Sequence, residues 1–375
     1  MFKQYKLKNF KFILVFYVVA LTTMGVMLVG SAKPSLQTKQ LFGLVAGLVI
    51  MIIVSLIDYN FILKFSWLIY LFMVGLLLVV IVAGDDTNGS QRWFEIAGIR
   101  FQPSELAKIL FILFFAYYFM KHEEKISTAK IIISSIVLAA VPLLLIVSQP
   151  DLSTTIVTAL IFVALLFVGG ISYKIVSVVL AICVPTFVII FSLLIQDKLP
   201  FIRAYQVKRV MAWLYPEDYP DIAYQQQNSI MAIGSGELWG KGLNNTDATS
   251  LKNGKFILEP QTDFIFAVAG EELGFIGTAT IIILLLLITI ECILIARKAK
   301  DMAGKLICCG MAALVGFQSI VNISVTSGLL PNTGLPLPFV SYGLTSLLSL
   351  YIGVGLVLNV GLQPKKYYSK GVTVR

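Results

Sequence analysis

The sequence predicts an all-α, polytopic integral membrane protein with about ten transmembrane helices. Two observations predict this class. The 375-residue chain is 58% hydrophobic and 13% charged, with a mean hydropathy of +0.89. Apolar runs of roughly 20 residues, long enough to cross a bilayer as a helix, also recur along the whole chain. Because these runs are continuously apolar and do not alternate every second residue, helices are expected and a membrane β-barrel is excluded.

The apolar runs place the helices in order. The first run has full spanning length and no small-residue cleavage site after it, so we expect it to remain as an anchor. Pro103 opens the fourth run and Pro150 precedes the sixth, and proline suits the first turn of a helix. The predicted helices are residues 10–30, 41–57, 62–83, 103–120, 130–147, 152–169, 173–195, 263–296, 306–329 and 338–361.

Basic residues in the connections give the orientation. An even number of helices puts both termini on one side, and the termini and connections of that side hold seventeen Lys and Arg against four in the short connections of the other. The richer side is therefore cytoplasmic. The seventeen are Lys3, Lys6, Lys8, Lys11, Lys64, Lys121, Lys125, Lys130, Lys174, Arg297, Lys298, Lys300, Lys305, Lys365, Lys366, Lys370 and Arg375; the four are Lys33, Lys39, Arg92 and Arg100. Residues 196–262 then form a large extracellular loop within a single domain, residues 1–375.

The cysteines and the histidine exclude several kinds of site. All four cysteines lie inside apolar segments, where they are small core residues and cannot staple the outer loops. The only histidine, His122, lies in a charged cytoplasmic turn, so no Cys and His cluster can bind a metal. A general base on the outer face must therefore be Asp, Glu, Lys or Tyr.

Asp263 is the acid whose position most needs a physical explanation. It lies in Glu259-Pro260-Gln261-Thr262-Asp263-Phe264, where the polar loop meets an apolar segment. It could cap the helix that follows, whose N-terminus would favour its ionised form. It could equally be a general base, which has only to be ionised and aimed at a proton donor. From the residues alone, the two interpretations are even.

Two further acids lie at the same outer boundary. Glu105 and Lys108 are three residues apart and so share one helix face, where an ion pair would avoid the cost of a lone ammonium near hydrocarbon. Their pair is either a structural clamp, which we favour, or a site where Lys108 also faces an anionic group. Asp151 precedes Leu152-Ser153-Thr154-Thr155, and capping that helix is its simplest role.

The loop of residues 196–262 combines basic, aromatic, amide and glycine residues. Arg203, Arg209 and Lys241 could hold phosphate in the headgroup layer, and side chains such as Gln226 and Ser229 suit sugars. The spacing of glycines excludes a phosphate-binding P-loop.

Four motifs together resemble the SEDS family (shape, elongation, division and sporulation proteins), over essentially the whole chain. They are Arg92-Trp93 with Gln102-Pro103-Ser104-Glu105; Gln149-Pro150-Asp151-Leu152-Ser153; the segment from Tyr224 to Gly242 with Glu259 to Phe264; and Asn332 to Gly343, which contains Ser341. The last is the most specific. The sequence departs from the family pattern at Leu258, where proline is common, at Lys39, where arginine is frequent, and at Leu344-Thr345, where Gly-Ser is common.

The resemblance implies an enzyme that polymerises lipid II into peptidoglycan glycan strands at the outer face of the bacterial cytoplasmic membrane, by an inverting mechanism. Asp263 would be the catalytic base. The supporting or substrate-binding residues would be Arg92, Trp93, Glu105, Lys108, Asp151, Arg203, Arg209, Gln226, Ser229, Lys241, Thr262 and Ser341. A divalent cation, Mg²⁺ or Mn²⁺, held by Asp263 and Asp151 is possible, and no organic cofactor is expected.

The resemblance also implies partners. Lipid II and undecaprenyl diphosphate would be bound, a class B penicillin-binding protein would crosslink the strands, and other elongation-complex membrane proteins would associate; no nucleic acid is expected. The short tails favour the elongation branch, typified by RodA, over the septal FtsW or sporulation branches. Two other classes stay open: a lipid II flippase, for which no internal repeat is evident, and a scaffold that would not need Asp263.

Overall fold

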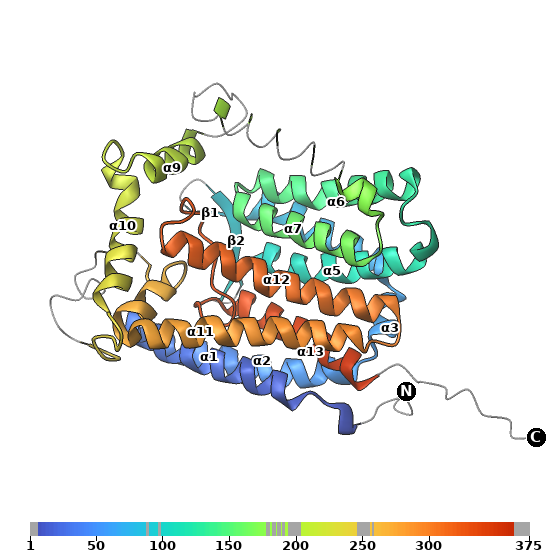
Figure 1. The fold of residues 1–375 in the computed structure, drawn as a ribbon, viewed down its shortest axis with the longest axis horizontal. Coiled ribbons are helices and arrows are strands. Elements are labelled where there is room, and N and C mark those ends of the chain that lie inside the picture. The colour runs from blue at the N-terminus through green and yellow to red at the C-terminus, as the bar shows by residue number, and fades with distance from the viewer. Residues whose placement is uncertain are drawn as a thin grey trace, which may run out of the picture.

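The computed structural model is a bundle of long helices that run roughly parallel to one another (Figure 1). It describes residues 7–363 except 88–89, 97–98, 178–203 apart from 181, 185, 189 and 192–193, 246–255 and 257–258. Among these residues, eight helices are long and apolar enough to cross a membrane, and α7 is a shorter apolar helix of 17 residues. The all-α membrane class predicted from hydropathy is therefore confirmed.

The N-terminal helices form one side of the bundle. A short 3-10 turn, Leu7–Asn9, leads into α1 (Phe12–Ala32) and α2 (Pro34–Leu56). The helix α2 begins seven residues before the apolar run, because Pro34 occupies its first turn and polar residues extend the helix beyond the hydrocarbon. The five-residue α3 (Tyr59–Leu63), capped by Asp58, and α4 (Ser66–Ala83) follow.

The connection after α4 contains strands that the hydropathy pattern missed. Strands β1 (Asp85–Thr87), β2 (Ser90–Ile96) and β3 (Ile99–Phe101) form an antiparallel sheet in the order β1-β2-β3. The register pairs Asp85 with Trp93, and Phe94 with Phe101. Such short strands give too brief a pattern to stand out beside apolar runs of spanning length.

The central helices are α5 (Pro103–Lys121), α6 (Ala129–Ser148) and α7 (Leu152–Val168), with a 3-10 turn at Glu123–Lys125 between the first two. Helix α5 is mostly buried, whereas α2, α4 and α6 leave much of their apolar surface exposed. Its phenylalanines pack against α4 and α7, as in the Phe114–Tyr70 and Phe115–Phe162 ring contacts. The predicted helix at 173–195 is described only in part: residues 173–177 are helical, and most of the remainder lies outside the described residues.

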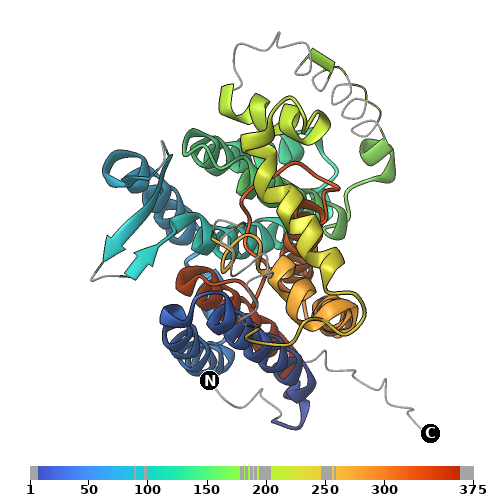
Figure 2. The same cartoon turned by 90° about the vertical axis from the view of Figure 1, so that its left-hand side faces the viewer.

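The segment predicted as a large extracellular loop contains two helices, α9 (Ala204–Leu214) and α10 (Pro220–Ser235). Both lie at one end of the bundle, whereas α1 begins and α13 ends at the other (Figure 1). Figure 2 looks onto the α10 end and shows α10 (yellow-green) and the strands (cyan) on opposite sides of it.

The C-terminal helices are α11 (Ile265–Arg297), α12 (Met302–Thr326) and α13 (Leu344–Leu362). Helix α12 packs against α5, α7, α11 and α13, so it is the centre of the bundle. Helix α13 packs closely on α2, where a Cβ added to Gly47 would lie 2.2 Å from the Tyr351 ring. The predicted helix at 338–361 begins six residues later than expected because residues 338–342 form turns and bends, after a segment 331–337 without regular secondary structure.

Helix α11 is broken at its outer end. Gly274 has φ 62° and ψ −161°, which interrupts the helix two turns after its start. The backbone after α10 fills the break: Phe275 and Ile276 donate to the carbonyls of Glu237 and Leu238, at 2.8 and 3.2 Å. Lys241 adds an ion pair of 2.9 Å to the buried Glu271. The outer part of α11 is thus fixed to the segment that follows α10, and Asp263 immediately precedes it.

Candidate active site

Asp263 lies in a turn of residues 259–264 at the outer end of α11 and is partly exposed. Three donors hold the backbone of this turn: the Asn322 amide donates to the Asp263 carbonyl at 2.8 Å, the Ser341 hydroxyl to the Thr262 carbonyl at 2.6 Å, and the Tyr342 N–H to the Gln261 carbonyl at 2.9 Å. The turn is therefore clamped to α12 and to the loop before α13.

The Asp263 side chain does not cap α11. The N-cap residue of α11 is Phe264, without a side-chain hydrogen bond. The carboxylate instead faces the loop before α13, since a Cβ added to Gly334 would lie 3.4 Å from Asp263 Oδ2. Within the part of the chain that the structure describes, no side chain or backbone donor forms a hydrogen bond with this carboxylate. The cap interpretation is thus wrong, and the carboxylate is available to bind a ligand.

Charged groups surround Asp263 and alter its pKa. The pKa of Asp263 is raised from its ordinary 3.8 to about 6. Desolvation is the largest cause, the charges of Glu259 and Asp151 also raise it, and Arg209 and Arg92 oppose the rise. The charges of two acids and two guanidinium groups therefore all influence the ionisation of Asp263. A carboxylate with a pKa near 6 is ionised at neutral pH and is a better proton acceptor than an ordinary aspartate.

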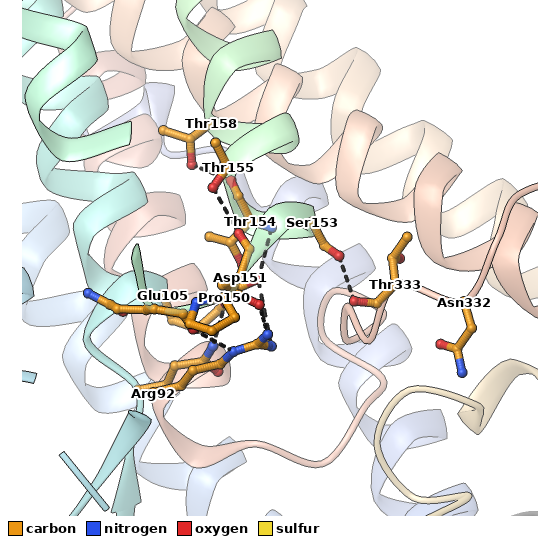
Figure 3. Close-up of polar contacts among 12 residues, drawn as sticks. Arg92, Glu105, Pro150, Asp151, Ser153, Thr154, Thr155, Thr158, Asn332 and Thr333 are labelled. Atoms are coloured by element: carbon orange, nitrogen blue, oxygen red, sulfur yellow. Dashed lines mark hydrogen bonds and ion pairs between the residues drawn. The ribbon is translucent and has the colours of Figure 1, made fainter. Parts of the chain in front are cut away.

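Asp151 and Arg92 meet at the start of α7 (Figure 3), and the charges of both act on Asp263. As predicted, Asp151 caps α7, accepting a hydrogen bond of 3.1 Å from Thr154 N–H. Asp151 Oδ2 accepts one of 3.3 Å from Gln102, and Arg92 forms an ion pair of 4.0 Å with the capping oxygen, Oδ1. Arg92 Nε also donates to the Gln149 carbonyl at 3.0 Å, and its NH2 group to the Pro150 carbonyl. Strand β2 thereby holds a guanidinium against the start of α7.

The loop before α13 joins these elements. Ser153 of α7 donates to the Thr333 carbonyl (Figure 3), and Arg209 of α9 donates to the Asn332 carbonyl at 3.4 Å. Ser341 is nearly buried and both donates to Thr262 and accepts from Leu337 N–H at 2.7 Å. The most specific sequence motif, Asn332 to Gly343, thus connects α7 and α9 with the Asp263 turn.

Glu105 and Lys108 form the predicted ion pair inside the bundle. Lys108 Nζ lies 2.7 Å from Glu105 Oε1 and 2.7 Å from Gln318 Oε1 of α12, and its side chain is 1% exposed. The second oxygen of Glu105 accepts from Ser346 of α13. The ammonium group is therefore enclosed among three helices, which fits the structural clamp and not a direct contact with an anionic ligand.

Several other predicted site residues also support the fold. Gln226 donates to the Val325 and Leu330 carbonyls, both at 2.7 Å, and the fully buried Ser229 donates to the Thr326 carbonyl at 2.8 Å. Lys241 is used in the ion pair with Glu271, and Thr262 donates to the Glu259 carbonyl at 3.0 Å. Trp93 lies on β2, partly exposed. Arg203 lies outside the described residues.

Comparison with known proteins identifies the family. The family model described as "Cell cycle protein", covering FtsW, RodA and SpoVE, matches residues 5–366. The chain belongs to this family. As a family member with eight long apolar helices in its described residues, it is a multi-pass protein of the bacterial cytoplasmic membrane.

Curated members of the family match over most of their length. The probable peptidoglycan glycosyltransferase FtsW of Trichlorobacter lovleyi is 32% identical over 377 residues, which cover 96% of this chain and 94% of that protein. The peptidoglycan glycosyltransferase MrdB of Escherichia coli K12 is 35% identical over 329 residues, covering 87% of this chain and 85% of that one.

Solved structures of the family share the fold. The structure titled "Structural coordination of polymerization and crosslinking by a peptidoglycan synthase complex" contains a chain with TM-score 0.77 and 28% identity, covering 94% of this chain and 97% of that one. The rod shape determining protein RodA of Thermus thermophilus has TM-score 0.67 and 26% identity, covering 94% of this chain and 96% of that one.

Two polar residues of α12 that contact the candidate site were not predicted from the sequence. Asn322, which is 1% exposed, uses its amide group for two hydrogen bonds, to the Asp263 carbonyl at 2.8 Å and the Leu335 carbonyl at 2.6 Å. Gln318, four residues earlier on α12, donates to the Pro336 carbonyl at 2.9 Å. Polar amides one turn apart within an apolar membrane helix were the available signal, since such residues seldom lie in membrane helices without a role.

Asn322 is therefore expected to position Asp263. In Asn322→Ala the Asp263 and Leu335 carbonyls lose their shared donor, so the turn shifts relative to the bound substrate. If Asp263 takes part in the reaction, as the sequence resemblance implies, we expect kcat to fall about 100-fold while KM changes little, because a small misplacement of such a group acts on the reacting step. Steady-state kinetics of glycan formation measure both constants.

The matched control is Thr326→Ala, one turn later on the same helix. Among the described residues, the Thr326 hydroxyl bonds only to carbonyls of its own helix, at 3.1 and 3.0 Å. This variant should keep the wild-type kcat. A folded Asn322→Ala protein with normal kcat would show that the amide does not position Asp263.

Proposed function

We propose that this chain polymerises lipid II into peptidoglycan glycan strands at the outer face of the cytoplasmic membrane, with Asp263 as the general base. One observation carries the proposal: the Asp263 carboxylate, partly exposed and with its pKa raised to about 6, lies where two arginines and Asp151 act on it. A base, nearby cations and an outer position are the parts that an inverting glycosyl transfer needs.

The coarser assignment rests on the relatives. Proteins of the same family that match at 32% to 35% identity carry the name peptidoglycan glycosyltransferase. The chain is a peptidoglycan glycosyltransferase of the SEDS family. Lipid II as substrate, the inverting mechanism and the role of each residue are the finer parts of our proposal.

The proposed step is a single displacement. The 4-hydroxyl of the acceptor's N-acetylglucosamine attacks the anomeric carbon of the donor's N-acetylmuramic acid. Asp263 accepts the hydroxyl proton as the new C–O bond forms, and the bond from the anomeric carbon to the phosphate oxygen breaks. Undecaprenyl diphosphate leaves with that electron pair. The α linkage of the donor becomes the β linkage of the product, so no covalent enzyme intermediate is required.

Positive charge for the leaving diphosphate comes from Arg92 and Arg209 in this proposal. Both guanidinium groups are close enough to lower the pKa of Asp263. Guanidinium groups bind phosphate oxygens through parallel hydrogen bonds and remain charged at every working pH. Lys108, the other cation that the sequence suggested, is enclosed by Glu105 and Gln318 and is not available.

A divalent cation fits the site only together with the substrate. Asp263 and Asp151 could supply two carboxylates, whereas among the described residues no cluster of three or more metal-binding side chains occurs. Mg²⁺ is commonly held by one or two carboxylates with substrate phosphates and water, so these two acids suit it. When bound, the cation would neutralise charge developing on the leaving diphosphate.

We further propose a RodA-like role in elongation with a class B penicillin-binding protein as partner, and an FtsW-like septal role as the alternative. The fold of a peptidoglycan synthase complex component supports a partner that crosslinks the strands. The identities of 35% to MrdB over 329 residues and 32% to an FtsW over 377 residues are too similar to separate the elongation branch from the septal branch. Depletion in the native bacterium separates them: loss of rod shape supports the elongation role, and filaments without septa support the septal one.

Purified protein supplied with fluorescent lipid II tests the enzymatic proposal. Long glycan chains, resolved by electrophoresis and digestible by a muramidase, are the expected product. In proteoliposomes, movement of labelled lipid II across the bilayer without polymer would favour the flippase instead. Neither polymer nor movement, in a preparation shown to be folded, would favour the scaffold.

The pH dependence of the reaction follows from the Asp263 pKa. A base must be deprotonated, so activity should rise with pH through about 6 and then level off. Glu259→Gln is the matched control, because the Glu259 charge is the second largest cause that raises this pKa. This variant should remain active, and the rise of its activity with pH should occur at lower pH than in the wild type. The measurement is kcat/KM against pH, and identical limbs in both proteins would contradict the assignment.

A further inference from the structure

A cavity of about 250 Å³ opens beside the start of α1 and the ends of α11 and α13, which is the cytoplasmic end of the bundle. Three lysines line it, Lys8, Lys11 and Lys298, and its apolar wall includes Phe10, Ile295 and Gly361. We call it the cytoplasmic cavity. It lies where the residues before α1, the end of α11 and the end of α13 meet.

The cytoplasmic cavity carries an excess of positive charge. Lys11 Nζ lies 3.6 Å from Glu291 Oε1, so one ammonium group is balanced. Lys8 and Lys298 are exposed, and neither forms an ion pair with any residue that the structure describes. Two of the lysines that line the cavity therefore have no carboxylate partner among the described residues.

The depth of the cavity indicates its ligand. Helices α1, α11 and α13 all cross the membrane, and their cytoplasmic ends mark the boundary between hydrocarbon and headgroups. A cavity at that boundary, with ammonium groups on one side and apolar residues on the other, matches a phosphate attached to a lipid. A fully soluble anion would not need the apolar wall.

We infer that the cytoplasmic cavity binds the phosphate headgroup of an anionic phospholipid of the inner leaflet. Lys8 and Lys298 bind the phosphate, and Phe10 and Ile295 contact the first apolar groups below it. The site is separate from glycan synthesis, and its occupancy ties the segment before α1 to the ends of α11 and α13.

The lysines also have a simpler role in setting topology, and Lys298 suits the C-terminus of α11. Either role is satisfied by lysines anywhere on the cytoplasmic face. Neither requires Lys8, Lys11 and Lys298 to converge on one cavity with an apolar wall. The presence of three lysines around one cavity therefore indicates a binding site and not only a general surface charge.

Binding of a short-chain phosphatidylglycerol to the full-length protein in neutral detergent tests the inference, with Kd measured by titration calorimetry. The variant is Lys8→Gln with Lys298→Gln. Its control is Lys121→Gln with Lys130→Gln, which removes the same charge from exposed lysines on the same face outside the cavity. We expect the first pair to weaken binding about 30-fold, the effect of two lysines near an anionic headgroup, and the control pair to keep the wild-type Kd.

Two further titrations identify the source of the phosphate. Short-chain phosphatidylcholine, whose headgroup has no net charge, should bind far more weakly than phosphatidylglycerol. Inorganic phosphate should bind weakly too, because it cannot use the apolar wall. Equal weakening by both lysine pairs, or inorganic phosphate binding as tightly as phosphatidylglycerol, would overturn the lipid site; the second result would assign the cavity to a soluble phosphate.

Discussion

Replacement of Asp263 by asparagine is expected to lower kcat for glycan polymerisation by about 100- to 10,000-fold, the contribution of a positioned general base. Asparagine has nearly the same shape as aspartate, and the backbone bonds from Asn322, Ser341 and Tyr342 to residues 261–263 do not involve the side chain. The turn should therefore keep its position, and the loss should fall on kcat. Single-turnover assays with labelled lipid II separate the chemical step from substrate binding.

The stability of the Asp263→Asn variant is an independent test of the raised pKa. Because folding raises the Asp263 pKa from 3.8 to about 6, the folded state binds the proton more tightly than the unfolded chain does. The ionised side chain therefore costs stability, and this cost grows as pH rises from about 4 to about 6 and is then constant. Asp263→Asn removes it, so at neutral pH the variant should be at least as stable as the wild type. An inactive variant that is also unstable would leave loss of folding as the cause and would count against the base.

Much of the fold could be predicted because hydrocarbon imposes a local rule. Each spanning helix must be apolar over about 20 residues, so α1, α4, α5, α6 and α12 appear in the sequence where the structure has them. The break at Gly274 could not be predicted in this way. It depends on residues 237–242, which supply hydrogen-bond partners for the freed backbone from another part of the chain.

The candidate site shows the same division. The acid itself and its outer position followed from the residue type and the topology, but excluding the cap required the geometry at Phe264 and Gly334. The polar residues of the loop illustrate the limit most clearly. Gln226 and Ser229 have side chains that suit sugars, yet both are buried and bond to backbone carbonyls of residues 325–330. Only tertiary structure shows whether a polar group is already satisfied.

The second large effect is expected at Lys108. Replacing it by methionine leaves the Glu105 carboxylate buried at 2% exposure without its counterion, and removing one partner of a buried pair costs about 3–5 kcal/mol of unfolding free energy. The double variant Glu105→Gln with Lys108→Met leaves no buried charge at this pair and should recover most of that stability. Thermal and denaturant unfolding in detergent measure both, and equal instability of the two would show that the lone charge is not the cause.

Activity of the same double variant tests whether this pair also serves the site. Lys108 donates to Gln318 Oε1, and Gln318 donates to the Pro336 carbonyl in the loop whose Gly334 faces Asp263. Without the ammonium group Gln318 loses the contact that orients it, even when no charge remains buried. The double variant should therefore be stable but slow, with kcat reduced and KM little changed. A stable double variant with wild-type kcat would show that the pair only holds α5 against α12 and α13 and does not position the active-site loop.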